Sequence, residues 1–463
     1  MPKKAVVIYL LLALLGAAIF IYFTFPRTKD EIPKSNNQRP FPSAPEPGGV
    51  PVPENIPHPD TPKLPPGPKL RVMAWASPGE SKELETEADA FQIETGRAVS
   101  LTIESDPATY RHDLPQAIAS ATPPDVCLIS ARDFSGLDPS ADLAAVTPSP
   151  DTTPRSIEAF TVGGEIRAVP DEFSVDLLFY NSSYFDQAGI GYPDRHWTWD
   201  ILESISRALA SLKLSDPSGQ PIYSLEIPVN FDFWNVLCAQ AGHPALDLNV
   251  WHLADTTAHD SQVRALDFFH NYFQELTVAA PPPKPDEIPG HYFAQQRSAL
   301  LIAPSDLAAN FPKVQYGMTV LPEDMARATI ACVNGWAVLT KSTQPDAARA
   351  LALYLSAQPV HAGWTTVQKP PDSDTSAALC QEALGQALLP RIESGAAPLV
   401  KTLDHQINVF ARTTGVTSES FYAQIQAQFR KISDSGSDAS ASSEPTWLKP
   451  NPRIQAAPQL RGP

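Results

Sequence analysis

The residue types that perform catalysis occur in this chain, but no recognised pattern arranges them. The sequence has no H-E-x-x-H, G-x-S-x-G, Walker or G-x-G-x-x-G motif. Its ten histidines are scattered, and the nearest to a helical pair, His252 and His259, has no third metal ligand nearby. A glycosidase needs two carboxylates at a fixed separation, which spacing cannot test among 51 acidic residues. The order of elements suggests no such fold, so we expect no catalytic residues, cofactor or metal.

The charge balance and the cysteines restrict the function further. The chain carries 34 basic and 51 acidic residues, a net charge of −17, and therefore lacks the basic surface of a nucleic-acid-binding protein. Cys127, Cys238, Cys332 and Cys380 are too far apart for a metal knuckle, and we expect partly buried free thiols. Some could pair in an oxidising compartment, and the sequence leaves the pairing open.

The N-terminal segment indicates the compartment. Lys3 and Lys4 precede an uncharged run over residues 5–25, which as a helix would span roughly 31 Å and match a membrane core. Its small residues lie inside the run and not after it, which favours an uncleaved anchor over a cleaved signal. No cysteine precedes Cys127, so a lipid anchor has no attachment residue here. The lysines predict a cytoplasmic N-terminus and an extracytoplasmic body, although Arg27 and other charges beyond the run weaken that bias.

Two biased segments flank the part of the chain that we expect to fold. Residues 26–69 contain 14 prolines, which exclude a helix and predict a semi-rigid stalk. Residues 433–463 begin with a Ser/Asp/Gly repeat, continue into a Pro-rich stretch, and are expected to be disordered. The folded body should therefore run over residues 70–432.

The first part of the body alternates strands and helices. An apolar run over residues 71–75 predicts a strand, and Ser77 with Glu80 has the form of a capping box at the start of a helix that Gly96 ends. Alternation at 99–103 and the apolar run at 124–129 predict two more strands, and the β-α-β-α-β order indicates an open α/β sheet. Ligands bind at the carboxyl ends of such strands, which here are the loops at 75–80 and 130–133.

Six short segments, in a fixed order, follow a known family pattern. They are FQIETGRAV at 91–99, PDV at 124–126, RAVP at 167–170, the stretch from LFYN at 178–181 through FDQAGI at 185–190 to Pro193 and Trp199, YGMTVLP at 316–322, and GWAV at 335–338. In this order they resemble the extracellular solute-binding proteins of bacterial ABC importers, in the carbohydrate-type group that includes maltodextrin-binding protein. The resemblance covers about residues 70–432.

The resemblance implies a two-lobe α/β fold of the periplasmic-binding-protein type (type II), with a ligand cleft between lobes joined by hinge strands. It places the hinge near residues 172–175 and 331–335. The implied organisation is an anchor at 1–25, a stalk at 26–69, lobe 1 from 70–172 plus 335–390, lobe 2 from 173–334 plus 391–432, and a tail at 433–463.

The resemblance also implies ligand-binding positions, because sugars are held by aromatic faces and by polar groups that bind hydroxyls. The candidates are Trp75, Glu80, Arg132, Asp133, Phe173, Phe231, Trp234, Asp306 and Trp336. Several have a structural alternative: Trp75 as a core anchor, Glu80 and Asp306 as helix caps, and Arg132 with Asp133 as a surface ion pair. Of Phe231 and Trp234, one is expected to face the ligand and the other to lie in the core.

The chain also departs from the family pattern. Ile129, Asp306 and Val400 stand where the maltodextrin binder has stacking tryptophans, which argues against a long α-glucan. Together with the anchor predicted at residues 1–25, the resemblance predicts a membrane-tethered receptor that passes a mono- or short oligosaccharide to ABC permease subunits. The alternative is a sensory or scaffolding ectodomain with the same fold and an altered or lost site.

Overall fold

The computed structural model describes residues 63–132, 137–244, 246–247, 252–253, 258–276, 278–281, 289–361, 363–370, 373–390 and 397–434. The predicted anchor, most of the predicted stalk and nearly all of the predicted tail lie outside these residues. Within them, no helix combines the length and the apolar character needed to cross a membrane.

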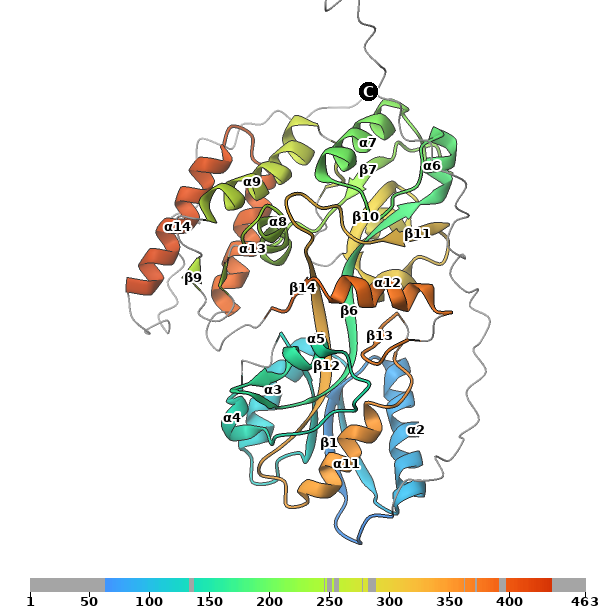
Figure 1. The fold of residues 1–463 in the computed structure, drawn as a ribbon, viewed down its shortest axis with the longest axis vertical. Helices are drawn as coiled ribbons and strands as arrows, with labels where there is room; N and C mark the ends of the chain where they lie inside the picture. Colours follow the sequence, from blue (N-terminus) through green and yellow to red (C-terminus); the bar gives the residue numbers. More distant parts are fainter. Residues whose placement is uncertain are drawn as a thin grey trace, which may run out of the picture.

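A mixed sheet runs through the whole molecule (Figure 1). Its central strands follow the order β2-β1-β3-β12-β6-β10-β7, with parallel pairs at either end and antiparallel pairs in the middle. These strands are β1 (Leu70–Trp75), β2 (Val99–Glu104), β3 (Val126–Ser130), β6 (Val169–Asn181), β7 (Tyr223–Glu226), β10 (Ser298–Pro304) and β12 (Thr329–Val338). The shorter strands are β4 (Thr161–Val162), β5 (Glu165–Ile166), β8 (Leu246–Asp247), β9 (His252–Leu253), β11 (Tyr316–Thr319), β13 (Thr365–Thr366) and β14 (Ala387–Leu388).

Strand β6 belongs to both lobes. Its first half pairs with β12, and its second half pairs with β10 and β11, so the sheet continues from one lobe into the other. Every residue of β6 is buried. The two segments predicted as the hinge lie side by side on these strands, with Ala331 opposite Val175 and Asn334 opposite Glu172.

Helices cover the two ends of the sheet separately (Figure 1). Around the β1-β2-β3 end, which forms lobe 1, lie α2 (Pro78–Thr95), α3 (Pro107–Ala119), α4 (Pro139–Asp142), α5 (Pro154–Ala159) and α11 (Pro345–Leu355). Around the β7-β10 end, which forms lobe 2, lie α6 (Ser182–Ala188), α7 (Trp199–Ser211), α8 (Phe231–Gln240), α9 (His259–His270) with its π-helical extension η3 (Asn271–Glu275), α10 (His291–Ala294), η4 (Ser305–Asn310), α13 (Ala397–Arg412) and α14 (Ser418–Asp434). Helix α12 (Thr375–Leu384) lies between them. The two-lobe α/β fold expected from the sequence is thereby confirmed.

Helix α2 shows how local sequence sets these elements. Ser77 and Glu80 form the predicted capping box: the Ser77 backbone N–H donates to Glu80 at 2.7 Å, and the Ser77 side chain accepts from the Glu80 backbone. Gly96 ends the helix with φ of 80°, a conformation that favours glycine. The helix packs Leu84 and Phe91 into the lobe 1 core.

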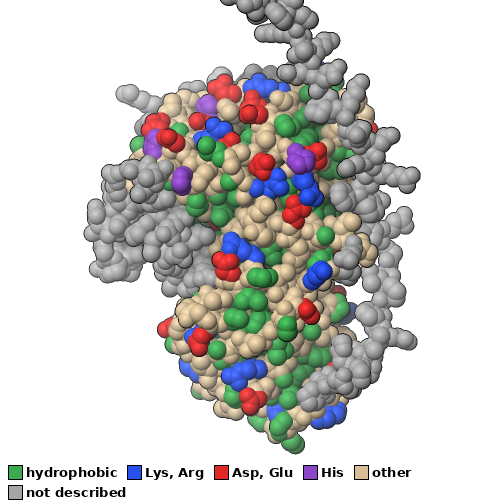
Figure 2. All heavy atoms as spheres, viewed as in Figure 1, with side chains coloured by type: hydrophobic (Ala, Val, Ile, Leu, Met, Phe, Trp, Pro, Cys, Tyr) green, Lys and Arg blue, Asp and Glu red, His purple; other side chains and the backbone are tan. Residues whose placement is uncertain are grey.

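Residues just before β1 are held against lobe 1 by hydrogen bonds. The Arg97 guanidinium donates to the carbonyls of Pro65 and Pro68 at 2.6 and 2.8 Å, and the Leu64 N–H donates to the Thr95 carbonyl at 3.0 Å. This end of the predicted stalk therefore packs against the C-terminal end of α2. On the face shown in Figure 2, acidic and basic side chains are interspersed over both lobes.

Candidate functional site

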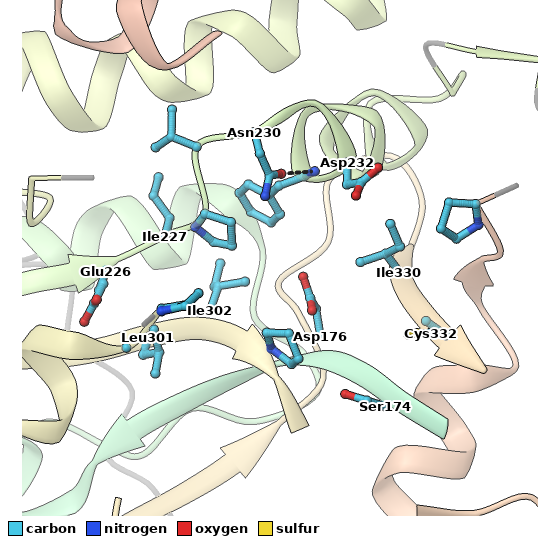
Figure 3. Close-up of a pocket in the computed structure, with 18 of the residues that line it drawn as sticks. Ser174, Asp176, Glu226, Ile227, Asn230, Asp232, Leu301, Ile302, Ile330 and Cys332 are labelled. Carbon is cyan, nitrogen blue, oxygen red and sulfur yellow. Dashed lines mark hydrogen bonds between the residues drawn. The ribbon is translucent and has the colours of Figure 1, made fainter. Parts of the chain in front are cut away.

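A cavity of about 340 Å³ lies between the lobes, against the strands that they share (Figure 3). Strands β6, β10 and β12 form its floor, and the segment from the end of β7 into α8 forms one wall. Lobe 1 contributes Arg132, which follows β3. The polar lining residues are Arg132, Ser174, Asp176, Glu226, Asn230, Asp232 and Asn408, and the rest of the lining is largely aliphatic.

The start of α8 is fixed by two hydrogen bonds. The Asn230 side chain caps the helix by accepting from the Phe233 N–H at 2.8 Å, the bond drawn in Figure 3. The Phe231 N–H donates to Asp404 of α13 at 2.7 Å. Together they place Asn230 and Asp232 against the cavity while the ring of Phe231 turns into the core.

The cavity is acidic. Asp176 is buried on β6 and projects into the open space (Figure 3). Burial, and then the negative charges of Asp232 and Asp306, raise the pKa of Asp176 to about 8. Burial also raises the pKa of Glu226 to about 7, opposed by backbone N–H groups at the start of α10, among them that of Phe293 at 2.9 Å.

An ion pair joins the lobes at this cavity. The Arg132 guanidinium of lobe 1 donates to the Asp232 carboxylate of lobe 2, and both side chains remain partly exposed. Among the described lining residues, Arg132 is the only lysine or arginine. Oppositely charged side chains of the two lobes are therefore in direct contact at the cavity.

A second polar cluster lies in lobe 1, around a small cavity of about 20 Å³. The Trp336 indole N–H donates to Asp171 at 2.9 Å, and the His361 Nδ1 lies 2.9 Å from a Glu172 oxygen. Burial lowers the pKa of His361, but the bond to Glu172 and the surrounding negative charges outweigh it and raise that pKa to about 9. Burial raises the pKa of Glu87 to about 7. Within the described residues, no group of three or more His, Cys, Asp or Glu side chains could hold a metal ion.

A more open groove of about 730 Å³ lies between β11 and α12. Serine and threonine hydroxyls, Tyr316 and Trp364 line it, and Asp374 is the charged residue among its described lining. Asp374 caps α12 by accepting from the Ala377 N–H at 2.9 Å. We take the cavity between the lobes as the candidate site because residues of both β6 and β12, the strands that carry the predicted hinge, line it.

The polar residues implied by the resemblance lie in different places. Arg132 lines the cavity, and Asp306 lies next to it, accepting a hydrogen bond from Ser174, which does line it. Burial raises the pKa of Asp306, and the Ser174 bond opposes that rise. Glu80 serves the capping box of α2, its structural alternative. Asp133 lies outside the described residues.

The aromatic residues implied by the resemblance do not line the cavity. Trp75 is half-buried, with its ring centroid 5.1 Å from that of Tyr110, and it lines the small lobe 1 cavity with Trp336. The other four are core side chains with exposed fractions of 0, 2, 0 and 3 %: Phe173, Phe231, Trp234 and Trp336. The expectation of an aromatic cleft wall is corrected for this conformation, because these rings are covered by neighbouring elements and present no free face to a sugar.

Sequence reasoning missed several cavity residues. They are Ser174, Asp176, Glu226, Asn230, Asp232, Cys332 and Asn408. Asp176 offered a signal, since it interrupts an apolar strand with a carboxylate that must be buried. Asn230 offered another, since an asparagine before an aromatic run is typical of a helix N-cap.

Comparison with protein families identifies the class of protein. The model for "Bacterial extracellular solute-binding protein" matches residues 75–360, and the chain therefore belongs to this family. The resemblance noted in the sequence is confirmed, and membership indicates an extracytoplasmic location. No curated protein sequence matches the chain.

Solved structures share the fold at low sequence identity. An ABC substrate-binding protein from Listeria monocytogenes in complex with cycloalternan is 19% identical with a TM-score of 0.64, covering 79% of this chain and 99% of its own. Maltose-bound MalE3 from T. maritima is 18% identical with a TM-score of 0.63, covering 79% and 100%. The GacH receptor of Streptomyces glaucescens, solved unliganded and with acarbose, is 15% identical with a TM-score of 0.62, covering 79% and 98%.

Proposed function

We propose that the chain captures a small solute between its lobes, by closure about β6 and β12, and delivers it to the permease subunits of an ABC importer. The observation that carries the proposal is the cavity that touches both lobes as well as strands β6 and β12. A ligand there contacts both lobes only when they are together, so its binding energy favours the closed form. The ion pair between Arg132 and Asp232 supports the same closed geometry.

The proposed solute is a monosaccharide or a short oligosaccharide. A volume of about 340 Å³ lies near the lower end of the range of about 300–1,000 Å³ for ligand pockets. Carboxylate and amide oxygens accept hydrogen bonds from sugar hydroxyls, while Ile302 and Ile330 offer aliphatic surface to ring C–H groups. Three proteins of the same fold were solved with cycloalternan, maltose and acarbose, which supports a carbohydrate. Phe233 is the one aromatic residue of the described lining and is buried, which argues against a long stacked chain.

The proposal includes a tether. Residues 5–25 would anchor the chain, and the Pro-rich segment after them would hold the body away from the membrane on its extracytoplasmic face. In this arrangement the receptor stays at the membrane that contains its permease and does not diffuse away from that surface.

A thermal-shift panel on the full-length chain tests the proposal. Monosaccharides, disaccharides, polyols and amino acids are added one at a time. A solute at 100 times its Kd adds about 2.7 kcal/mol to the free energy of unfolding, which raises Tm by several degrees. The site variant is Asn408→Ala, because Asn408 lines the cavity. The matched control is Glu85→Gln on the exposed side of α2.

A shift with one sugar class that is reduced in Asn408→Ala and retained in Glu85→Gln would support the proposal. A flat panel on folded protein would contradict it and would favour a sensory or scaffolding ectodomain, whose site has changed or been lost.

A further inference from the structure

We propose that the solute carries a protonated amine, which Asp176 binds in the cavity between the lobes. The inference rests on the proposed function and narrows its substrate class to an amino sugar or a similar aminated polyol. It follows from the charge balance of the cavity and from the burial and missing hydrogen-bond partner of the Asp176 side chain.

The cavity has more carboxylates than its cation can neutralise. Three carboxylates line it, those of Asp176, Glu226 and Asp232. Arg132, the one arginine of the described lining, is paired with Asp232, and Glu226 accepts from the N–H of Phe293 at the start of α10. Among the described residues, no positively charged side chain pairs with the Asp176 carboxyl group.

Two more carboxylates stand just behind the lining. Asp306 accepts from Ser174 at the floor, and Asp404 accepts from the Phe231 N–H at the start of α8. Each makes the cavity more negative, because a charge in a poorly solvated site is weakly screened. The surroundings of Asp176 therefore favour a positively charged guest.

Asp176 itself points to a ligand. The residue is 7 % exposed, and its carboxylate projects into the cavity (Figure 3). No hydrogen-bond donor within the described part of the chain reaches this carboxylate. Burying an ionised carboxylate without a partner costs several kcal/mol, so in the empty cavity Asp176 keeps its proton, and a cationic group of the ligand can take the place of that proton.

An amine suits this position better than a hydroxyl. A sugar hydroxyl brings one donor and no charge, whereas an ammonium brings three donors and a positive charge. Charge-assisted hydrogen bonds are roughly twice as strong as neutral ones. Around Asp176 the lining is aliphatic, with Ile302 and Ile330 nearby, which suits the carbon ring that would carry the amine (Figure 3).

The release of protons on ligand binding provides a second measurement. Burial and neighbouring carboxylates raise the pKa of Asp176 to about 8 in the empty cavity, so at pH 7 it is largely protonated. An ammonium beside it stabilises the carboxylate and lowers that pKa. Binding of the amine at pH 7 should therefore release a large fraction of a proton, and binding of the neutral analogue should release none.

The test compares matched sugars on the full-length chain by titration calorimetry. The pairs are D-glucosamine with D-glucose, D-galactosamine with D-galactose, and D-mannosamine with D-mannose, with N-acetyl-D-glucosamine as a neutral nitrogen-bearing control. Putrescine is the amine without a sugar. Each titration is repeated in two buffers of different ionisation enthalpy, which measures proton release on the unmodified protein.

We expect at least one amino sugar to bind tenfold or more tightly than its neutral partner, with proton release. Asp176→Asn should abolish that preference while Glu85→Gln retains it. Melting curves check that both variants fold, and the proton release needs no variant.

Equal or tighter binding of the neutral member in every pair overturns the inference and leaves the proposed function standing. Binding of putrescine with no sugar of either kind supports the amine site and overturns the sugar class. Absence of all binding overturns both.

Discussion

Replacement of Trp234 by alanine separates a structural role from a ligand-binding role for the aromatic residues of α8. The Trp234 side chain is fully buried, its ring centroid lies 5.9 Å from that of Phe231, and its indole N–H donates to the Gln262 carbonyl of α9 at 3.3 Å. Its neighbours Asp232 and Phe233 line the cavity, but Trp234 does not. We expect Trp234→Ala to lower stability and to leave solute affinity nearly unchanged.

The size of the loss follows from the burial. Truncation of a buried tryptophan to alanine costs about 3–5 kcal/mol, from lost transfer free energy and the cavity left behind. The hydrogen bond to Gln262 adds little, because 3.3 Å is long for an N–H donor. With a denaturant slope of about 3 kcal/mol per M, the urea midpoint should fall by about 1–1.7 M.

Far-UV circular dichroism in urea measures the midpoint, and calorimetry in the absence of urea measures solute affinity on the folded variant. Leu212→Ala serves as the control, since Leu212 is 46 % exposed at the end of α7 and its truncation should cost well under 1 kcal/mol, on the order of a few tenths. A Trp234→Ala variant with an unchanged midpoint and abolished solute binding would refute the reasoning, because it would place the ring at the ligand.

Three further predictions concern other parts of the fold. His361 binds its proton more tightly in the folded state, where its pKa is about 9 instead of 6.5. The bound proton contributes up to about 3 kcal/mol to the free energy of unfolding; this contribution is fully present below pH 6.5 and should be lost as the pH rises through 9. In urea unfolding, His361→Gln should show a smaller dependence of stability on pH. Gly335→Ala should cost about 1–3 kcal/mol by the same measurement, because the added Cβ would lie 2.8 Å from a buried phenylalanine ring. A double-mutant cycle of Arg132→Ala and Asp232→Ala, read by urea unfolding, should give a coupling of about 1 kcal/mol, since both side chains are partly exposed; zero coupling would mean that the pair does not hold the lobes together.

Local signals predicted the elements well. Ser77 and Glu80 specify the start of α2 through contacts three residues apart, and Gly96 specifies its end through its own backbone freedom. The loops at the carboxyl ends of the first strands were expected to face the ligand, and Arg132 does line the cavity. Such features depend on neighbours in the sequence, which is why the sequence reveals them.

The orientation of the aromatic side chains could not be predicted from the local sequence. Whether a ring on α8 faces the cleft or the core depends on the rotation of that helix. The bond from Phe231 to Asp404 helps to set this rotation, and the two residues lie far apart in the chain. Asp176 was missed for a similar reason: it sits in an apolar strand, and only the pairing of β6 with β10 and β12 brings it to the cavity.

The two ends of the described body leave from different lobes. Leu64 and Arg97 fasten the N-terminal approach to the far end of α2 in lobe 1, whereas α14, which ends the described chain, packs Phe421 and Tyr422 into the core of lobe 2. A rotation of one lobe on the other therefore changes the distance between the two ends. Dyes placed near Lys63 and on α14 would report opening and closing directly, without any label in the cleft. A tether that pulls on lobe 1 would leave lobe 2 as the part that swings.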